Sequence, residues 1–217
     1  LLETRLQTGE PYLLFIDTAN RELAQHQRAA GLVVRQSNLC SEILLPTERD
    51  HLGRARTAVC CLASVNLERW DEWCGHERFV EDVLRMLDNV LEDFIERAPH
   101  SMAAARYSAG RDRSVGLGAM GFHSYLQRSG IPFESALARS ANLRMFRHLR
   151  RAADAASGRL AAERGACPDA AERGVAERFS HKLAIAPTAS ISVICGGTSA
   201  CIEPIPANVY THKTLSG

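Results

Sequence analysis

The sequence has no long apolar run, no excess of either charge and no Cys-x-x-C pair. A membrane-spanning helix needs roughly 18–20 consecutive apolar residues, so none is expected here. Lys and Arg number 26 against 25 Asp and Glu, a net charge of +1, and this balance does not favour a nucleic acid or an anionic membrane as a partner. The missing Cys-x-x-C disfavours a simple thiol oxidoreductase.

Cysteine is well represented, although no signal peptide opens the chain. An odd number of cysteines in such a chain argues against a disulfide framework. We therefore expect a cytoplasmic protein with reduced thiols, one or two of which are reactive. The 217 residues begin with Leu rather than Met, and we expect a fragment or a processed chain. The seven cysteines are Cys40, Cys60, Cys61, Cys74, Cys167, Cys195 and Cys201.

Hydrophobic periodicity predicts helices that alternate with short buried strands, which is the α/β class. Apolar residues at three- and four-residue steps predict amphipathic helices over 79–97 and 146–165. Apolar and β-branched residues predict buried strands within 31–47 and 57–67. The start of the chain is expected to be helical on both sides of 11–17. No repeat or linker divides the chain.

Two motifs suggest a cofactor or a metal, each with a structural alternative. GLGAMG, 116–121, matches the G-x-G-x-x-G pattern of dinucleotide-binding turns, but the preceding SAGRDRSV is polar rather than a buried strand. Glycines that let a loop pack closely on the helix GFHSYLQ are the alternative. The groups of Cys60, Cys61, Cys74 and His76 bind metals, but their spacing is poor for zinc and buried apolar thiols are the alternative.

The stretch APTASIS, 186–192, follows the apolar KLAIA. Small and hydroxylated residues after a strand can present backbone N–H groups and hydroxyls to a phosphate. A plain strand-to-helix turn capped by Thr188 or Ser190 is the alternative.

The stretch SNLCSEI, 37–43, places Asn38, Cys40 and Glu42 on alternate positions, which share one side of an extended segment. A carboxylate beside a thiol raises the pKa of the thiol, so Cys40 is badly placed as a thiolate nucleophile. It is better placed to act while neutral, as a donor and acceptor of a hydrogen atom. Glu42 can take a proton from a hydroxyl group. A buried structural cysteine is the alternative.

Six separated motifs occur in the order that is found in one family. Together they resemble the large (α) catalytic subunit of ribonucleotide reductase, most closely the bacterial class I ribonucleoside-diphosphate reductases. The resemblance implies an α/β fold that is part of a ten-stranded α/β barrel with a central finger loop. It also implies an enzyme that reduces ribonucleoside diphosphates to 2′-deoxyribonucleoside diphosphates by thiyl-radical chemistry, for DNA precursor synthesis. The motifs are TGEPYLLFIDTANR, SNLCSEI, AVCCLASVNL, VGLGAMGFHSYLQ, LAIAPTASIS and GGTSACIEPIPANVYTHKTLSG.

The family pattern assigns catalytic roles to three residues of SNLCSEI. Cys40 would become the thiyl radical that removes the 3′-hydrogen of the ribose and later returns it. Asn38 would hydrogen-bond the sugar hydroxyls, and Glu42 would accept the proton of the 3′-hydroxyl. Leu39 and Ser41 would complete the substrate contacts of this segment.

The resemblance also implies a reducing group and a phosphate site. One member of the redox-active cysteine pair maps to Cys60, and its partner maps outside the chain. No metal ligands are implied. The segment expected to hold the substrate phosphates consists of Pro187, Thr188, Ala189, Ser190 and Ile191.

The family works with partners. The resemblance implies a radical from a separate metal-containing small (β) subunit, thioredoxin or glutaredoxin as reductant, an α homodimer and a cytoplasmic location, with no nucleic acid or membrane. No cofactor is expected to bind in this segment. The adenosylcobalamin-dependent class and a non-catalytic nucleotide-binding or scaffolding relative are the alternatives.

The resemblance covers only a central part of the family's chain. We expect residues 1–217 to form a partial catalytic barrel domain that is inactive by itself. The N-terminal effector regions, the radical-relay tyrosines and the C-terminal cysteine tail are expected to be absent.

Overall fold

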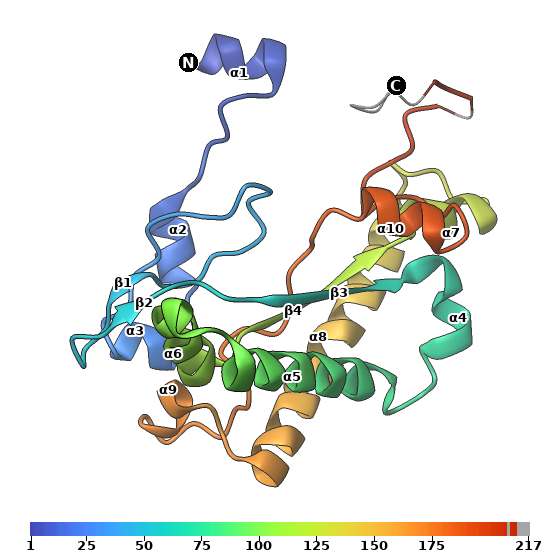
Figure 1. Ribbon diagram of the computed structural model, residues 1–217. Coiled ribbons are helices and arrows are strands. Elements are labelled where there is room, and N and C mark those ends of the chain that lie inside the picture. The colour runs from blue at the N-terminus through green and yellow to red at the C-terminus, as the bar shows by residue number, and fades with distance from the viewer. Residues whose placement is uncertain (208, 212–217) are drawn as a thin grey trace. The chain divides into compact units, whose positions relative to one another are not determined.

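The computed structural model describes residues 1–207 and 209–211 as a mixture of helices and short strands (Figure 1). The end of the last sequence motif, including THKTLSG, therefore falls largely outside the described residues. The mixture confirms the α/β class. No helix among the described residues is both long and apolar enough to cross a membrane. The elements are α1 (Leu2–Thr8), α2 (Ile16–Arg21), α3 (Gln25–Ala29), β1 (Glu48–Arg49), β2 (Ala55–Arg56), β3 (Cys61–Asn66), the 3-10 turn η1 (Leu67–Arg69), α4 (Trp70–Trp73), α5 (Phe79–Arg97), the 3-10 turn η2 (His100–Met102), α6 (Ala103–Asp112), β4 (Val115–Met120), α7 (Phe122–Arg128), α8 (Ala136–Arg164), α9 (Pro168–Ala171) and α10 (Ala189–Ile194).

The chain divides into two compact units, which are described separately below. Unit 1 comprises Leu1–Cys61, Asp88–Val115 and Ser157–His181. Unit 2 comprises Leu62–Leu87, Gly116–Ala156 and Lys182–Gly217. The segment SNLCSEI and Cys60 belong to unit 1, whereas the segment APTASIS belongs to unit 2.

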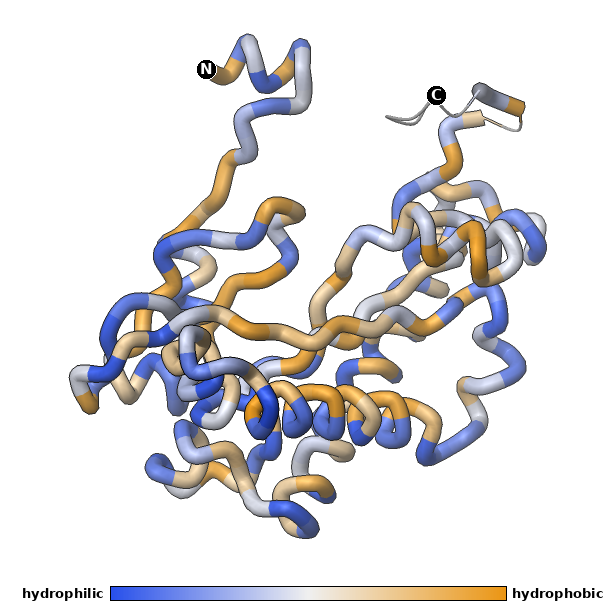
Figure 2. Tube along the Cα trace, in the orientation of Figure 1, coloured by the Kyte–Doolittle hydropathy of each residue, from blue (hydrophilic) through white to orange (hydrophobic). Residues whose placement is uncertain are grey.

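The two long helices follow from the hydrophobic pattern. Helix α5 has the bounds that its periodicity predicts, and apolar and polar residues alternate along it in Figure 2. Helix α8 begins earlier than predicted, at Ala136. Its first part buries small side chains, Ala138 and Ala141, ahead of Met145 and Leu149. Because alanine gives a weak hydrophobic signal, the stripe was not visible in this part of the sequence.

The strands are few and short among the described residues. β1 and β2 form an antiparallel hairpin in which Glu48 lies opposite Arg56. β3 and β4 form a second two-stranded sheet, and Leu117 of β4 also makes a parallel bridge to Leu183. The strand predicted within 57–67 is thus confirmed over its second half.

The strand predicted within 31–47 is wrong, because the structure has a loop there before β1. The apolar residues of the pattern are buried, with Val34 at 0% and Leu45 at 3% exposure, but no strand lies beside them. The side chain of Asn20 replaces the missing neighbour. Its Nδ2 donates to the Val34 carbonyl at 2.9 Å, and its Oδ1 accepts from the Val34 N–H at 2.8 Å. Both backbone groups are therefore satisfied without a β-ladder.

The charged run before GLGAMG forms no strand up to Ser114, in agreement with the sequence analysis, because α6 occupies most of it. Asp112, Arg113 and Ser114 are buried rather than solvated, and a buried strand, β4, begins at Val115 on the motif itself. The run is buried because its charges have partners, as buried charges require.

The carboxylate of Asp88 on α5 is the centre of one such buried ion-pair cluster in unit 1. It is fully buried and is surrounded by the guanidinium groups of Arg113 at 2.7 Å, Arg164 at 2.8 Å and Arg178 at 3.1 Å. Burial alone would raise the pKa of the Asp88 carboxyl, but its bonds to Arg113 and the other arginines hold that pKa below the ordinary value. The cluster therefore joins α5 to the start of β4 and to the end of α8.

We expect Asp88→Asn to lower the free energy of unfolding by about 3–5 kcal/mol, because the buried guanidinium groups of Arg113 and Arg178 would keep only the partly exposed Glu92 as a counter-charge. Asp93→Asn on the same helix is the matched control, since the Asp93–Arg97 pair is exposed and should leave the urea midpoint unchanged. The depressed pKa of Asp88 means that its contribution is present above the ordinary carboxyl pKa and is lost as the pH falls below it. Equal urea midpoints for the two variants at pH 7 would contradict this account.

Candidate active site

The loop 33–47 is closed at its base and at its tip. At the base, the Thr47 N–H donates to the Val33 carbonyl at 3.3 Å. At the tip, the Ser41 N–H donates to the Asn38 carbonyl at 3.1 Å. In Figure 1 the loop is the blue segment between α3 and β1. These two hydrogen bonds close the loop that carries Asn38, Cys40 and Glu42.

The tip of this loop presents its residues to solvent. Leu39 is 85% exposed, and Cys40 is an exposed free thiol. Ser41 has a φ of 65°, a left-handed conformation that is uncommon for a residue other than glycine. Because the chain turns here, the expected alternation of Asn38, Cys40 and Glu42 along an extended strand is wrong.

Glu42 has the opposite environment to Cys40. It is half-buried, and its Oε2 atom is buried without a hydrogen-bond partner among the described residues. A buried carboxylate oxygen without a partner costs free energy. Glu42 therefore has an acceptor oxygen that no described residue satisfies.

Cys60 lies in the same unit, within electrostatic reach of Glu42. Burial is the main reason that the pKa of the Cys60 thiol rises to about 12, and Cys61, Asp112 and Glu42 add to the shift in that order. The thiol is half-buried, and its Sγ lies 3.8 Å from the Cys61 carbonyl. Cys60 is therefore held as a neutral thiol, and the carboxylate of Glu42 adds to this effect.

Asp112 is a part of this neighbourhood that sequence reasoning missed. It closes α6, is 4% exposed and accepts a hydrogen bond from the Ser114 N–H at 3.1 Å. Burial, the largest cause, raises the pKa of its carboxyl to about 7. No signal in the sequence points to its burial, because an aspartate between two arginines resembles a solvated charged run. Both Cys60 and Cys167 have their pKa raised further by this carboxyl.

In unit 2, the segment 187–191 forms the start of α10. Thr188 is its N-cap residue but makes no side-chain cap bond. Instead its buried Oγ1 accepts from the Cys201 N–H at 2.6 Å. Ala189, Ser190 and Ile191 are exposed, and their N–H groups have no acceptor among the described residues. The expected turn into a helix is confirmed, but the cap by Thr188 or Ser190 is not formed.

The glycines of GLGAMG serve packing within unit 2. A Cβ on Gly118 would collide with the Ala184 carbonyl oxygen, and one on Gly121, with φ of 77°, would collide with Asn66 and Thr198. This agrees with the close-packing interpretation of the motif.

The described residues contain no group of three or more His, Cys, Asp or Glu side chains that could hold a metal ion. The cluster suggested by Cys60, Cys61, Cys74 and His76 is therefore not assembled.

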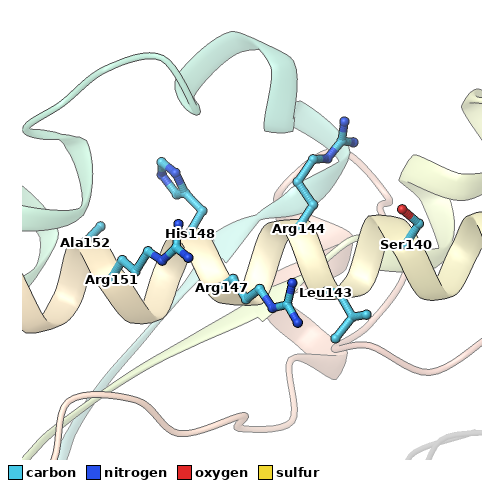
Figure 3. A pocket seen from close by; sticks show the side chains of 7 residues that line it. All are labelled: Ser140, Leu143, Arg144, Arg147, His148, Arg151 and Ala152. Atoms are coloured by element: carbon cyan, nitrogen blue, oxygen red, sulfur yellow. The ribbon is translucent and has the colours of Figure 1, made fainter.

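A basic hollow of about 720 Å³ lies on α8 in unit 2 (Figure 3). All seven of its lining residues belong to that helix, among them Arg144, Arg147, His148 and Arg151. The His148 ring packs edge-on against Trp70, with 5.1 Å between the ring centroids. A single helix lines this hollow. It is therefore a shallow feature on the exposed face of α8 and not a cleft between elements. None of the predicted site residues lines it.

The raised pKa of Cys60 makes a testable prediction about its reactivity. At pH 8 only about one Cys60 in ten thousand is a thiolate, so we expect its alkylation by iodoacetamide to speed up about tenfold per pH unit between pH 8 and 10. A Cys61→Ser background and peptide mass spectrometry isolate the Cys60 signal. A plateau of the rate below pH 10 would contradict the prediction.

Asp112→Asn should make alkylation of Cys60 faster at every pH above about 8, where the native carboxyl is ionised and opposes the thiolate. Asp93→Asn, an exposed change on α5, is the control and should leave the pH profile unchanged. An identical profile for Asp112→Asn and the native chain would show that the two groups do not interact.

The comparisons with known proteins agree with one another. A family model described as "Ribonucleotide reductase, barrel domain" matches residues 1–177 and 169–217. The ribonucleoside-diphosphate reductase large subunit of Invertebrate iridescent virus 3 is 47% identical over 100% of this chain and 33% of its own length. A vitamin B12-dependent ribonucleoside-diphosphate reductase of Mycobacterium tuberculosis is 35% identical over 95% of this chain and 29% of its own length.

A solved structure gives the same result for the fold. The class Id ribonucleotide reductase alpha subunit of Actinobacillus ureae matches with a TM-score of 0.87 and 36% identity, over 96% of this chain and 39% of that chain. This chain thus spans about a third of the length of the relatives that it matches. With a family model that matches along its length and an α subunit whose fold covers almost all of it, the chain belongs to the ribonucleotide reductase barrel-domain family.

Proposed function

We propose that this chain provides part of the catalytic barrel of an enzyme that reduces ribonucleoside diphosphates to 2′-deoxyribonucleoside diphosphates. The observation that carries the proposal is the loop 33–47, which we take as the finger loop. Its turned tip exposes the Cys40 thiol, and its Glu42 has a buried oxygen without a partner and contributes to the raised pKa of Cys60. A neutral thiol, a carboxylate and a second thiol in one unit are the groups that radical reduction of a sugar needs.

The chemistry assigns one role to each group. A thiyl radical on Cys40 takes the hydrogen atom from C3′ and returns it at the end. Glu42 accepts the proton of the 3′-hydroxyl, which helps the 2′-hydroxyl to leave as water. Cys60 and a partner cysteine outside the chain supply two electrons and two hydrogens and become a disulfide. One C–O bond is thus exchanged for a C–H bond, with water as the other product.

The raised pKa of Cys60 suits this role. A thiol that stays protonated can deliver hydrogen, whereas a thiolate cannot. Burial is the main reason that Cys60 stays protonated, and the nearby carboxyls add to this effect.

We propose that the segment Pro187–Ile191 holds the substrate phosphates. The open N–H groups of Ala189, Ser190 and Ile191 and the Ser190 hydroxyl offer donors to an anion at the start of α10. Thr188 acts differently from the sequence-based expectation, because its hydroxyl already holds the Cys201 N–H. It shapes the segment, and Ser190 supplies the free hydroxyl.

The radical and the reductant would come from partners. We propose a separate metal-containing small subunit as the source of the radical, thioredoxin or glutaredoxin as the reductant of the Cys60 pair, a homodimer of the large subunit and a cytoplasmic location. The mycobacterial relative, whose name specifies vitamin B12, favours adenosylcobalamin as a second candidate source of the radical.

The native polypeptide that carries residues 1–217 should convert CDP to dCDP when it is supplied with a small subunit and a dithiol. Cys40→Ser should reduce the product to the background level, because oxygen cannot replace sulfur as the carrier of the hydrogen atom. Cys74→Ser, at the end of α4, is the matched control and should retain activity. Turnover by Cys40→Ser at the native rate would overturn the proposal. Turnover that needs adenosylcobalamin instead of a small subunit would select the second candidate.

Ser190→Ala should weaken binding of CDP about tenfold, because one hydrogen bond to a charged group is worth about 1.5 kcal/mol. The binding of cytidine, which has no phosphate, should be unchanged by the same substitution. Isothermal titration of the native polypeptide with both compounds measures this difference. An equal loss for cytidine and CDP would place Ser190 away from the phosphates.

A further inference from the structure

The amide side chain of Asn38 is part of the turn that carries Cys40. Its Oδ1 accepts a hydrogen bond from the Ile43 N–H at 3.0 Å. Since a backbone N–H can only donate, the atom that faces it must be the amide oxygen rather than the amide nitrogen. This bond closes a ring of chain around residues 39–42.

The backbone of Asn38 closes a second, smaller ring. Its carbonyl accepts from the Ser41 N–H at 3.1 Å and from the Ser37 hydroxyl at 3.1 Å. Ser41 is thereby held in its left-handed conformation, with φ of 65°. Within the described residues, every hydrogen bond made by residues 39–43 ends on Asn38. The placement of Cys40 therefore depends on this single residue.

The amide nitrogen of Asn38, Nδ2, makes no hydrogen bond among the described residues, since both side-chain bonds of Asn38 involve Oδ1. Because Nδ2 is the polar atom of the Asn38 amide that has no partner in the turn, it is the group free to donate to a ligand. A sugar oxygen that contacts it must accept the hydrogen bond.

We propose that Asn38 is a positioning residue for Cys40: its amide oxygen locks the turn, and its amide nitrogen donates to the substrate. This inference rests on the proposed function for the substrate contact, and it adds to that function the locking of the turn and the direction of the hydrogen bond to the sugar. The locking of the turn requires no substrate and can be tested independently.

Two substitutions separate the two roles. Asn38→Asp keeps an oxygen that can accept from Ile43 but loses the NH₂ donor. Asn38→Ala loses both. Ser37→Ala is the control, because it removes the Ser37 hydroxyl from the Asn38 carbonyl at 3.1 Å but leaves the bond between the Asn38 side chain and the Ile43 N–H in place.

Amide hydrogen exchange of Ile43 measures the lock directly, with the Val34 amide as an internal reference because Asn20 holds it at 2.8 Å. Relative to Val34, we expect exchange at Ile43 to become about tenfold faster or more in Asn38→Ala. It should change little in Asn38→Asp and in Ser37→Ala. Unchanged exchange in Asn38→Ala, or equally fast exchange in Asn38→Asp and Asn38→Ala, would overturn the proposal. If Asn38→Ala unfolds and Val34 also becomes fast, the comparison of Asn38→Asp with the native chain decides.

Kinetics of the native polypeptide provide the second readout. Asn38→Asp should raise KM for CDP more than it lowers kcat, because the substrate donor is lost while the thiol stays in place. Asn38→Ala should lower kcat further. Equal kcat values for the two variants would contradict the positioning role. If the native polypeptide forms no deoxynucleotide, the proposed function fails, and the exchange measurement still decides whether Asn38 locks the turn.

Discussion

The site depends on amide side chains that satisfy the backbone of a loop without a strand partner. Asn20 pairs with both polar groups of Val34, and Asn38 accepts the N–H of Ile43. A buried segment with open N–H and C=O groups would pay a large desolvation cost. Asn20 removes that cost for Val34 at the base of the loop, and Asn38 holds the turn at its solvent-exposed tip. As a result an exposed cysteine can be held in a defined place by a segment that is not a strand.

The second constraint is electrostatic. Unit 1 gathers carboxyls near Cys60, and burial and these charges raise the pKa of the thiol to about 12. The same unit neutralises another buried acid, Asp88, with three arginines, whereas Asp112 keeps a pKa near 7 because burial outweighs its favourable contacts. Such surroundings suppress thiolate chemistry and favour reactions of the neutral thiol. This is the condition that hydrogen-atom transfer requires.

The sequence predicts the bounds of an element correctly where the hydrophobic pattern depends on that element alone. Helix α5 has the predicted bounds, since its leucines recur at helical spacing on a face that is buried. The apolar pattern around Val34 predicts a strand where the structure has a loop, because a packed loop and a strand bury similar apolar residues. Only the position of Asn20, fourteen residues away in sequence, decides between them.

The candidate site could be predicted only in part from the sequence. The chemical character of SNLCSEI could be read from its residues, and the family resemblance supplied the roles. Asp112 could not be found in this way, because its burial depends on partners far along the chain. The polar run RDRS carries no sign of whether solvent or arginine and aspartate side chains surround it.

The most direct test of the account is to run the reaction of the native polypeptide in D₂O with unlabelled CDP and to locate deuterium in the dCDP by NMR. The account predicts deuterium at C2′, where hydrogen arrives from exchangeable thiols of the Cys60 pair. It predicts hydrogen at C3′, where Cys40 returns the atom that it removed. Deuterium at C3′ together with none at C2′ would contradict the roles assigned to both cysteines.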